Sequence, residues 1–331
     1  MLDMSLPLDQ RLDALLPALL DEHKVPGAAV AVIEGGTTLV RGYGLRHAEE
    51  AEPVGPETVF EAASLGKPLF AYAVMKRVLA GEIDLDRPLA GELDAPFAEE
   101  GEWLGRITAR HVLSHSTGFP NWRPNRFTSE PEPLRVEREP GRRFGYSGEG
   151  YMYLQAVMAR RGGEPLDRFM QASVFDPLGL VSTSYRWSDR FEADFATPHG
   201  PLGEAGDKWR AREPGSAYSL HSTAADLALF LEAMLAEEDE TAAAMLVPQT
   251  EISDSLAWSL GWGIERRPEG NWFWQWGDNS GFKHFVFGSR GEGRAVLVLT
   301  NARLGTHVYR AVAENVLSFL PAALDFEMIR Y

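Results

Sequence analysis

The 331-residue sequence is long enough for one large domain or two lobes, and its 44% hydrophobic residues supply ample material for a core. The formal net charge of −16 at pH 7 argues against nucleic acid or an anionic membrane as a partner, because both bind basic surfaces. The absence of cysteine excludes disulfides, thiolate catalysis and cysteine metal sites.

No stretch approaches the roughly eighteen consecutive apolar residues that a membrane-spanning helix requires. The first residues also lack a basic segment followed by an apolar core, which is the pattern of a secretory signal peptide. We therefore expect a soluble, cytoplasmic protein that acts on a small molecule and binds neither nucleic acid nor a membrane.

Two elements are predicted near the N-terminus. Leucines recur at spacings of three and four over residues 8–23, which predicts an amphipathic helix with Pro17 inside it. The apolar runs 27–33 and 37–40 are separated by a glycine-containing turn at 34–36, a pattern typical of a β-hairpin.

The middle of the chain is mostly helical in pattern, and the C-terminal part returns to strands. Apolar stripes with helical spacing cover residues 69–79, 152–159, 166–174 and 226–235. Short apolar runs at 272–276, 284–287 and 295–299 follow, separated by glycine-containing turns, and the last predicted helix covers 306–319.

Strands at both ends of the chain around a helical middle predict an α+β fold. Its antiparallel sheet is built from both chain ends and flanked by helices, with a mainly helical lobe inserted. We expect a single unit over residues 1–331, with an α/β lobe formed by 1–60 and 250–331 and a helical lobe formed by 61–249.

Ser64 and Lys67 lie where an apolar, strand-like stretch passes into a helical one. A serine in the first turn of a helix and a lysine three residues later share one face. A serine nucleophile needs an adjacent base and a site that stabilises an oxyanion; Lys67 supplies the base if burial lowers its pKa, and the N–H groups at the helix start supply the site. Taken alone, the pair also fits a helix-capping serine and a solvated lysine.

Tyr146 belongs to a second candidate element, in a loop before a helix that begins near Glu149. A phenol hydrogen-bonded to an ammonium can have a lowered pKa and relay protons between nucleophile and leaving group, although alone this tyrosine also fits a core edge. Residues 145–149 nearly match the G-x-S-x-G turn of α/β-hydrolases, with Glu149 in place of the last glycine. That near match offers Ser147 as a competing nucleophile, although no clear apolar strand precedes it.

A third candidate element runs from Gln275 to Phe282, at the end of a predicted strand. Strand alternation places Gln275 and Gly277 on one face and the tryptophans of this strand on the other. A glycine on the face nearest a nucleophile lets substrate approach the backbone closely, although an ordinary core strand with a glycine turn fits the pattern too. Five tryptophans in this part of the chain fit either an apolar acyl pocket or the core between sheet and helix: Trp258, Trp262, Trp272, Trp274 and Trp276.

Taken in chain order, these elements resemble the serine β-lactamase and penicillin-binding-protein superfamily. Within it they are most similar to the class C β-lactamase-like branch, which includes family VIII carboxylesterases and D-amino peptidases. Several matches in the same order are more specific than any one of them. The matching segments are 25–32, 60–67, 111–118, 146–151, 222–228 and 281–282.

The resemblance implies a β-lactamase/transpeptidase-like fold and a role for each matching residue. Ser64 would be the nucleophile, Lys67 and Tyr146 the proton-transfer pair, and the backbone N–H groups of Ser64 and Asp278 the oxyanion hole. We expect no metal and no cofactor.

His111 and His115 have the i, i+4 spacing of two zinc ligands on one helix face. No glutamate follows His111 directly, and the resemblance implies a structural helix and turn at this place. We therefore expect these histidines to be structural.

Two positions depart from the family pattern. Gly148 stands where the tyrosine motif usually ends in asparagine, so a side-chain amide that would hold a substrate amide is missing. Gln275 stands, in a gapless alignment, where the third motif usually begins with lysine or histidine. The alternative is that the motif begins at Trp276, as in the W-x-G pattern of family VIII esterases, which would put Asp278 at the glycine position.

In either alignment the third motif lacks its usual cation, which would bind a substrate carboxylate. We therefore expect a serine hydrolase that acts on small neutral carboxylic esters through an acyl-enzyme, with substrate contacts from Gly148, Gln275, Trp276 and Gly277. The alternatives are a D-amino peptidase, an amidase or a weak β-lactamase of the same family, or a degenerate homologue that binds a ligand without turnover.

Overall fold

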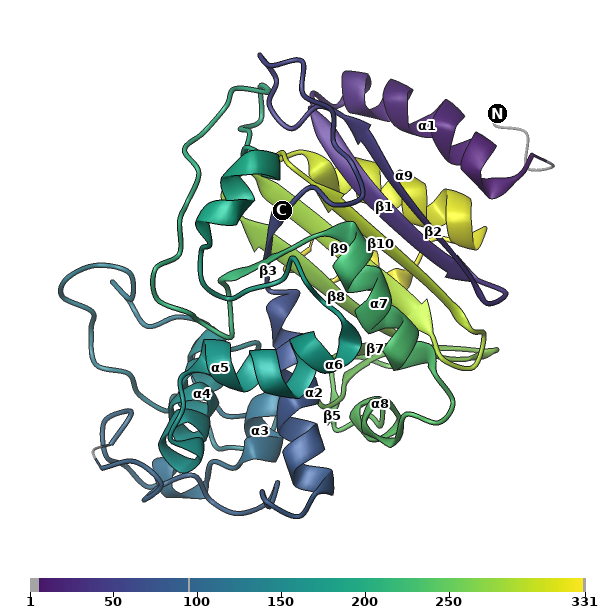
Figure 1. Cartoon of the computed structure of the whole chain (residues 1–331). Helices are drawn as coiled ribbons and strands as arrows, with labels where there is room; N and C mark the ends of the chain where they lie inside the picture. Colours follow the sequence, from purple (N-terminus) through teal and green to yellow (C-terminus); the bar gives the residue numbers. More distant parts are fainter. Residues whose placement is uncertain (1–5, 95, 330–331) are drawn as a thin grey trace.

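The computed structural model describes residues 6–94 and 96–329; most of the N-terminal segment inspected for a leader peptide lies outside them. Its centre is an antiparallel sheet of eight strands in the order β2-β1-β10-β9-β8-β7-β6-β5 (Figure 1). The strands are β1 (Gly27–Glu34), β2 (Thr37–Gly44), β5 (Thr250–Glu251), β6 (Leu256–Trp258), β7 (Gly263–Arg267), β8 (Gly270–Asn279), β9 (Phe282–Ser289) and β10 (Arg294–Thr300).

The N-terminal hairpin and the C-terminal strands join through β1 and β10, which pair from Ala28 opposite Thr300 to Ile33 opposite Ala295. This pairing confirms that both chain ends build one sheet. Neighbouring strands in the sheet follow antiparallel registers, and the hairpin turn after β8 brings Asp278 opposite Lys283.

Helices cover both faces of the sheet (Figure 1). Helices α1 (Leu8–Glu22) and α9 (Gly305–Leu317) pack together on one face, and α7 (Ala224–Leu235) packs against β1 and β10 on the other. Along β1, Val30 and Val32 belong to the core under α1 and α9, whereas Ala31 and Ile33 belong to the core that includes α7. Because both faces are covered, the strand reads as an uninterrupted apolar run.

The inserted part of the chain is mainly helical, as predicted, and adds a short two-stranded sheet that the sequence did not indicate. This sheet pairs β3 (Phe60–Ala63) with β4 (Leu220–Ser222). The predicted helix over 166–174 is instead α5 (Leu166–Met170) followed by a π-helical turn. The remaining helices are α2 (Gly66–Leu79), α3 (Ala109–Leu113), α4 (Gly148–Gly162), α6 (Asp176–Leu178) and α8 (Glu240–Met245).

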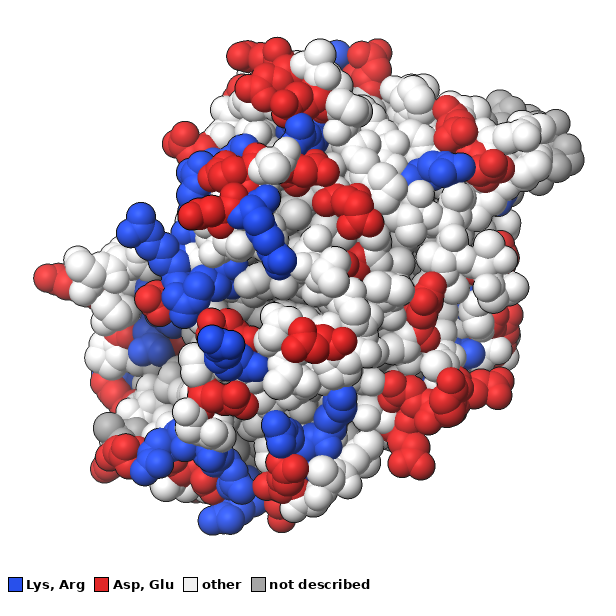
Figure 2. Space-filling view, viewed as in Figure 1, with Lys and Arg blue, Asp and Glu red and all other residues white. Residues whose placement is uncertain are grey.

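Most acidic side chains lie at the surface, although Glu61, Glu149, Asp226 and Glu265 are buried. Figure 2 shows acidic side chains gathered beside α8, where the exposed run Glu237-Glu238 leads into the helix. Asp239 caps α8 by accepting the N–H of Ala242 at 2.8 Å. Within residues 6–94 and 96–329, no helix combines the length and the apolar character needed to cross the bilayer.

Candidate active site

Ser64 lies in a turn between β3 and α2, and the backbone around it is closely constrained. Ala63 adopts a left-handed conformation with φ of 51°, which costs a residue with a side chain roughly 1–2 kcal/mol and redirects the chain sharply before Ser64. A Cβ at Gly277 would come within 2.7 Å of the Ala62 carbonyl oxygen, so only glycine lets β8 approach β3 this closely. These contacts place the serine beside the third motif.

Lys67 lies one helical turn beyond Ser64 and is almost completely buried. Its Nζ lies 2.9 Å from Ser64 Oγ and donates to the carbonyl oxygen of Ala217 at 2.5 Å. Burial disfavours the charged ammonium and lowers the pKa of Lys67 to about 7. A substantial fraction of neutral amine is therefore present at neutral pH, as a base for the serine requires.

The lowered pKa of Lys67 predicts the pH dependence of catalysis. Only a neutral amine can accept a proton from Ser64, so if Lys67 is the base for hydrolysis of p-nitrophenyl acetate, kcat/KM is expected to rise with pH through about 7 and then level off. Glu61, which lines the same cleft, also has a pKa raised by burial to about 7. The pH dependence of kcat/KM in Glu61→Gln separates the two groups. The rise near pH 7 persists in this variant if it reports Lys67 and disappears if it reports Glu61.

Tyr146 lies just before α4, and its hydroxyl is hydrogen-bonded with Ser64 and accepts the Nε2 N–H of Gln275 at 3.2 Å. Burial raises the pKa of the phenol, and the hydrogen bonds with Ser64 and Gln275 only partly oppose that effect. The lowered pKa considered from the sequence is therefore not found. Lys67 Nζ lies 4.8 Å from the centre of the phenol ring. Tyr146 is a protonated phenol beside the nucleophile, suited to donate a proton.

Gln275 is fully buried behind the serine. Its Nε2 donates both to the Tyr146 hydroxyl and, at 2.9 Å, to the carbonyl oxygen of Ser64. Because that carbonyl can only accept, the orientation of the amide is defined. Gln275 thus lies on the face of β8 that contacts Ser64 and Tyr146, as expected for the third motif. Trp276 lies on the opposite face of the strand, with its ring centre 4.6 Å from that of Tyr146.

Ser64, Lys67 and Tyr146 open onto one cleft of the molecule. Trp276 and Asp278 line it, whereas the other candidate substrate contacts, Gln275, Gly277 and Gly148, are buried behind its wall. Its other charged lining residues are Glu61, Glu204, Asp207 and Arg303, and its other aromatic lining residues are Trp122, Phe127, Trp209 and Tyr218.

The third motif is held by contacts that the sequence did not indicate. The Asp278 carboxylate pairs with Lys283 at 2.5 Å. Asn279 Nδ2 donates to the carboxylate of Glu61 at 3.2 Å and to the carbonyl of Tyr218 at 3.3 Å. The two bonds of Asn279 join β8 to β3 and to the segment whose Ala217 carbonyl accepts from Lys67. Each connects residues more than sixty positions apart in the sequence.

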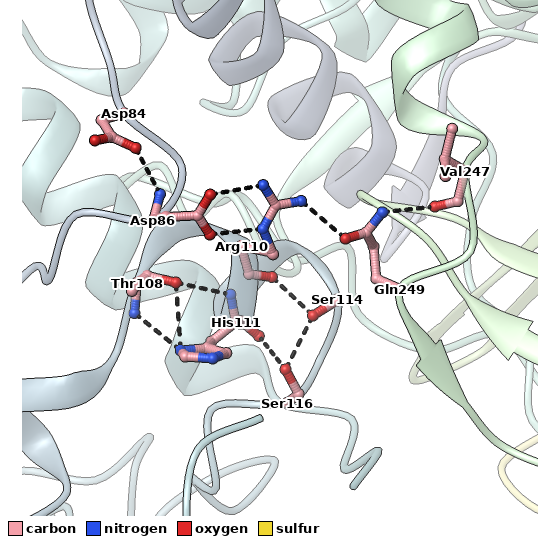
Figure 3. Close-up of polar contacts among 9 residues, drawn as sticks. All are labelled: Asp84, Asp86, Thr108, Arg110, His111, Ser114, Ser116, Val247 and Gln249. Carbon is pink, nitrogen blue, oxygen red and sulfur yellow. Dashed lines mark hydrogen bonds and ion pairs between the residues drawn. The ribbon is translucent and has the colours of Figure 1, made fainter. Parts of the chain in front are cut away.

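His111 and His115 have separate structural roles. The Nδ1 of His111 accepts the N–H of Thr108, which closes the capping box of α3 (Figure 3). The neighbouring Arg110 binds the carboxylate of Asp86 through two nitrogens and also donates to Gln249 (Figure 3). His115 Nδ1 accepts the N–H of Ser147 at 3.0 Å, and its ring centre lies 4.1 Å from that of Tyr146. His115 therefore helps to hold the loop that carries the tyrosine.

Ser147 does not fit the role of a nucleophile. It is buried at the N-terminus of α4, where its Oγ accepts the N–H of Gly150 at 3.0 Å and donates to the carbonyl of Pro120 at 2.8 Å. The near match to the α/β-hydrolase turn is therefore a helix cap.

The tryptophan cluster divides between the core and the cleft. Trp276 lines the cleft, whereas Trp258, Trp262, Trp272 and Trp274 are almost completely buried in the two cores of the molecule. The aromatic side chains that do line the cleft come mostly from the inserted part of the chain, where no sequence pattern singled them out.

Comparisons with known proteins identify the family and the fold of this chain. Residues 12–319 match the family model described as Beta-lactamase. Esterase EstB from Burkholderia gladioli is 27% identical over 89% of this chain and 90% of its own length. The D-aminopeptidase of Gluconobacter oxydans is 26% identical over 80% of this chain, which spans 53% of that longer protein.

Among solved structures, a β-lactamase/D-alanine carboxypeptidase from Pseudomonas syringae superposes with a TM-score of 0.81. It covers 94% of this chain and 98% of its own, at 19% identity. A likeness at that identity establishes the fold: helices flanking a large antiparallel sheet, as in the β-lactamase/transpeptidase fold.

Proposed function

This chain belongs to the β-lactamase family of serine hydrolases, and we propose that it hydrolyses small neutral carboxylic esters through an acyl-enzyme on Ser64. The observation that carries the serine assignment is the 2.9 Å contact between Ser64 Oγ and the buried amine of Lys67. Neutral Lys67 takes the serine proton as Oγ attacks the ester carbonyl, and Tyr146 donates a proton to the leaving alkoxide. The Tyr146 phenolate then takes a proton from the water that attacks the acyl-enzyme, and the Lys67 ammonium returns its proton to Ser64 as the acid is released.

The oxyanion formed on attack is assigned to the backbone N–H groups of Ser64 and Asp278. In an antiparallel ladder, hydrogen-bonded and non-bonded pairs alternate, and the pair next to the two-residue turn, Asn279–Phe282, is a bonded one. Asp278 lies one residue before Asn279, so the alternation directs its N–H away from β9. This direction is consistent with an N–H group that donates toward the cleft. Such a donor is typically worth roughly 10²–10³ in rate.

The charge of the cleft supports neutral esters over β-lactams and D-alanyl peptides, which carry a carboxylate. Carboxylates of Glu204, Asp207 and Asp278 line it, together with the buried Glu61, and outnumber the cation Arg303, although Asp278 is paired with Lys283. The third motif contributes the uncharged Gln275 where the family usually has a cation, so a carboxylate there would meet no positive charge from that motif. The likeness to esterase EstB along nearly the whole chain points the same way.

Parallel assays test the proposal. p-Nitrophenyl acetate or butyrate is expected to be hydrolysed with a kcat/KM at least about 100-fold above that for nitrocefin or D-alanine p-nitroanilide, a ratio typical of sites that leave a substrate group unpaired. A higher kcat/KM for the anilide would favour the D-amino peptidase alternative, and a higher one for nitrocefin the β-lactamase alternative. A fluorophosphonate that attaches to no residue would favour a ligand-binding homologue without turnover.

Gln275 offers a separate test of the proton path. Gln275→Leu keeps the side-chain volume but removes the hydrogen bonds to Tyr146 and Ser64, each worth about 1 kcal/mol. We expect kcat for ethyl acetate to fall about tenfold with KM nearly unchanged, because its alkoxide needs a proton to leave, whereas p-nitrophenolate does not. The matched control is Gln249→Leu, which loses its contact with Arg110 far from the cleft and should keep the parent rate. Equal losses in both variants would contradict the role of Gln275.

A further inference from the structure

Trp122 occupies the space that a side chain at position 148 would need. A Cβ built on Gly148 would lie only 2.2 Å from Cη2 and 2.3 Å from Cζ2 of the Trp122 ring. Such distances do not occur between real atoms, so the glycine and the indole are complementary. The six-membered ring of Trp122 therefore covers the backbone two residues after Tyr146, beside the reacting groups.

The segment that carries Trp122 is firmly anchored to the first turn of α4. The side chain of Asn121 accepts the N–H of Gly148 at 3.0 Å, and its backbone carbonyl accepts the N–H of Glu149 at 3.1 Å. Glu149 is completely buried, and its carboxylate binds Arg123 through Nε and Nη2, both at 2.8 Å, and Arg126 at 3.3 Å. Hydrogen bonds on both sides of Trp122 thus fix the indole before any substrate arrives.

Three further aromatic side chains continue the surface that Trp122 begins. Tyr218 lies edge-on to Trp122, with ring centres 5.7 Å apart, and Phe127 is edge-on to both. Trp209 stacks on Tyr218 at 5.8 Å. All four rings line the cleft, and Phe127 and Trp209 are 64% and 41% exposed, whereas Trp122 and Tyr218 also pack against the core.

Within the described residues no ring contact joins Trp122, Phe127 or Tyr218 to the pair of Tyr146 and Trp276, and the aromatic wall reaches the nucleophile. Tyr218 follows Ala217, whose carbonyl oxygen lies 3.3 Å from Ser64 Oγ. Tyr146, which the proposed mechanism assigns to the leaving alkoxide, contacts Trp276 at 4.6 Å between ring centres. The alcohol part of an ester therefore belongs beside Tyr146 and Trp276, which leaves the wall of Trp122, Phe127 and Tyr218 for the acyl part.

We propose that Trp122, locked over Gly148, forms an acyl-binding wall with Phe127 and Tyr218 that selects esters of aromatic or arylalkyl carboxylic acids. This inference rests on the proposed esterase function and names its substrate class. A flat aromatic acyl group gains edge-to-face and offset contacts with these rings, whereas an acetyl group has no ring with which to make them.

The test compares p-nitrophenyl phenylacetate with p-nitrophenyl acetate, which share a leaving group. The parent is expected to favour phenylacetate in kcat/KM by about tenfold or more, and Trp122→Ala to remove that preference, with phenylacetate losing about tenfold more than acetate. Trp103→Ala is the matched control, because Trp103 is also partly buried but lies outside the cleft lining. It should keep the preference.

Other outcomes separate this inference from the function on which it rests. Equal losses for both esters in Trp122→Ala, or a parent without the preference, would overturn the acyl wall and leave the esterase intact. A Trp122-dependent preference for benzyl acetate over ethyl acetate would place the aromatic group on the alcohol side and overturn it as well. Absence of Ser64-dependent ester hydrolysis would overturn both the acyl wall and the proposed esterase function. If Trp122→Ala melts well below the parent, Trp122→Leu supplies the same comparison without an aromatic face.

The packing itself has a readout that does not need turnover. Gly148→Ala in the parent places a Cβ against the indole and is expected to lower the melting temperature, whereas the same change in Trp122→Ala no longer meets the ring and should cost less. A loss that is equal in both backgrounds would show that Trp122 does not cover Gly148.

Discussion

Ser64→Ala is expected to lower kcat/KM for p-nitrophenyl acetate by roughly 10⁴-fold or more, because it removes the hydroxyl that forms the acyl-enzyme beside the amine of Lys67. The oxyanion donors and the substrate-binding surface remain in the variant, so a small rate above that of buffer is expected to survive. The measurement is a steady-state rate at enzyme concentrations high enough to distinguish this small remaining activity from hydrolysis in buffer alone. Mass spectrometry after incubation with a fluorophosphonate should show one adduct on the parent and none on the variant.

Ser147→Ala is the control for this experiment. The substitution removes the cap of α4 and is expected to cost about 1 kcal/mol of stability. Peptide mapping should still find the adduct on Ser64, and the rate should stay within a few-fold of the parent. An adduct on Ser147, or a Ser64→Ala variant that keeps the parent rate, would contradict the assignment.

Much of the fold was predictable because it is encoded in local patterns. The hairpin of β1 and β2, the strands β8 to β10 and the helices α1, α2, α4, α7 and α9 follow from apolar spacing and glycine-containing turns. Ser64 and Lys67 are also a local pair, since three residues along one helical turn bring their side chains together. The sheet topology required one further inference, which is that strands from the two chain ends pair with each other. The pairing of β1 with β10 confirms this inference.

The rest of the site depends on contacts between distant parts of the chain. Trp122 meets Gly148 and Tyr218, and Glu61 meets Asn279, only after the inserted helices have packed against the sheet. A tryptophan in a polar loop carries no signal of that position. The pKa of Tyr146 illustrates the same limit, because its direction depends on how completely the fold buries the phenol.

Lys67→Met is expected to lower kcat by roughly 10²–10⁴, the usual contribution of a positioned general base. Methionine has a similar length and no amine, so Ser64 Oγ loses the group at 2.9 Å that accepts its proton. Because the native amine is already desolvated, an apolar side chain at this buried position should cost little stability. The limb of the pH profile near 7 should also vanish, since its titrating group is gone.

Lys67→Arg separates the charge of this side chain from its basicity. A guanidinium keeps a positive charge near Ser64 and Tyr146 but cannot accept a proton in the accessible pH range. If Lys67 acts as the base, the arginine variant is as impaired as the methionine variant at every pH, and its labelling by the fluorophosphonate slows in parallel. If the arginine variant instead retains most of the parent rate, the side chain acts only through its charge, and the proton of Ser64 must leave by way of Tyr146. The raised pKa of that buried phenol argues against this second path, since a phenolate is scarcely populated near neutral pH.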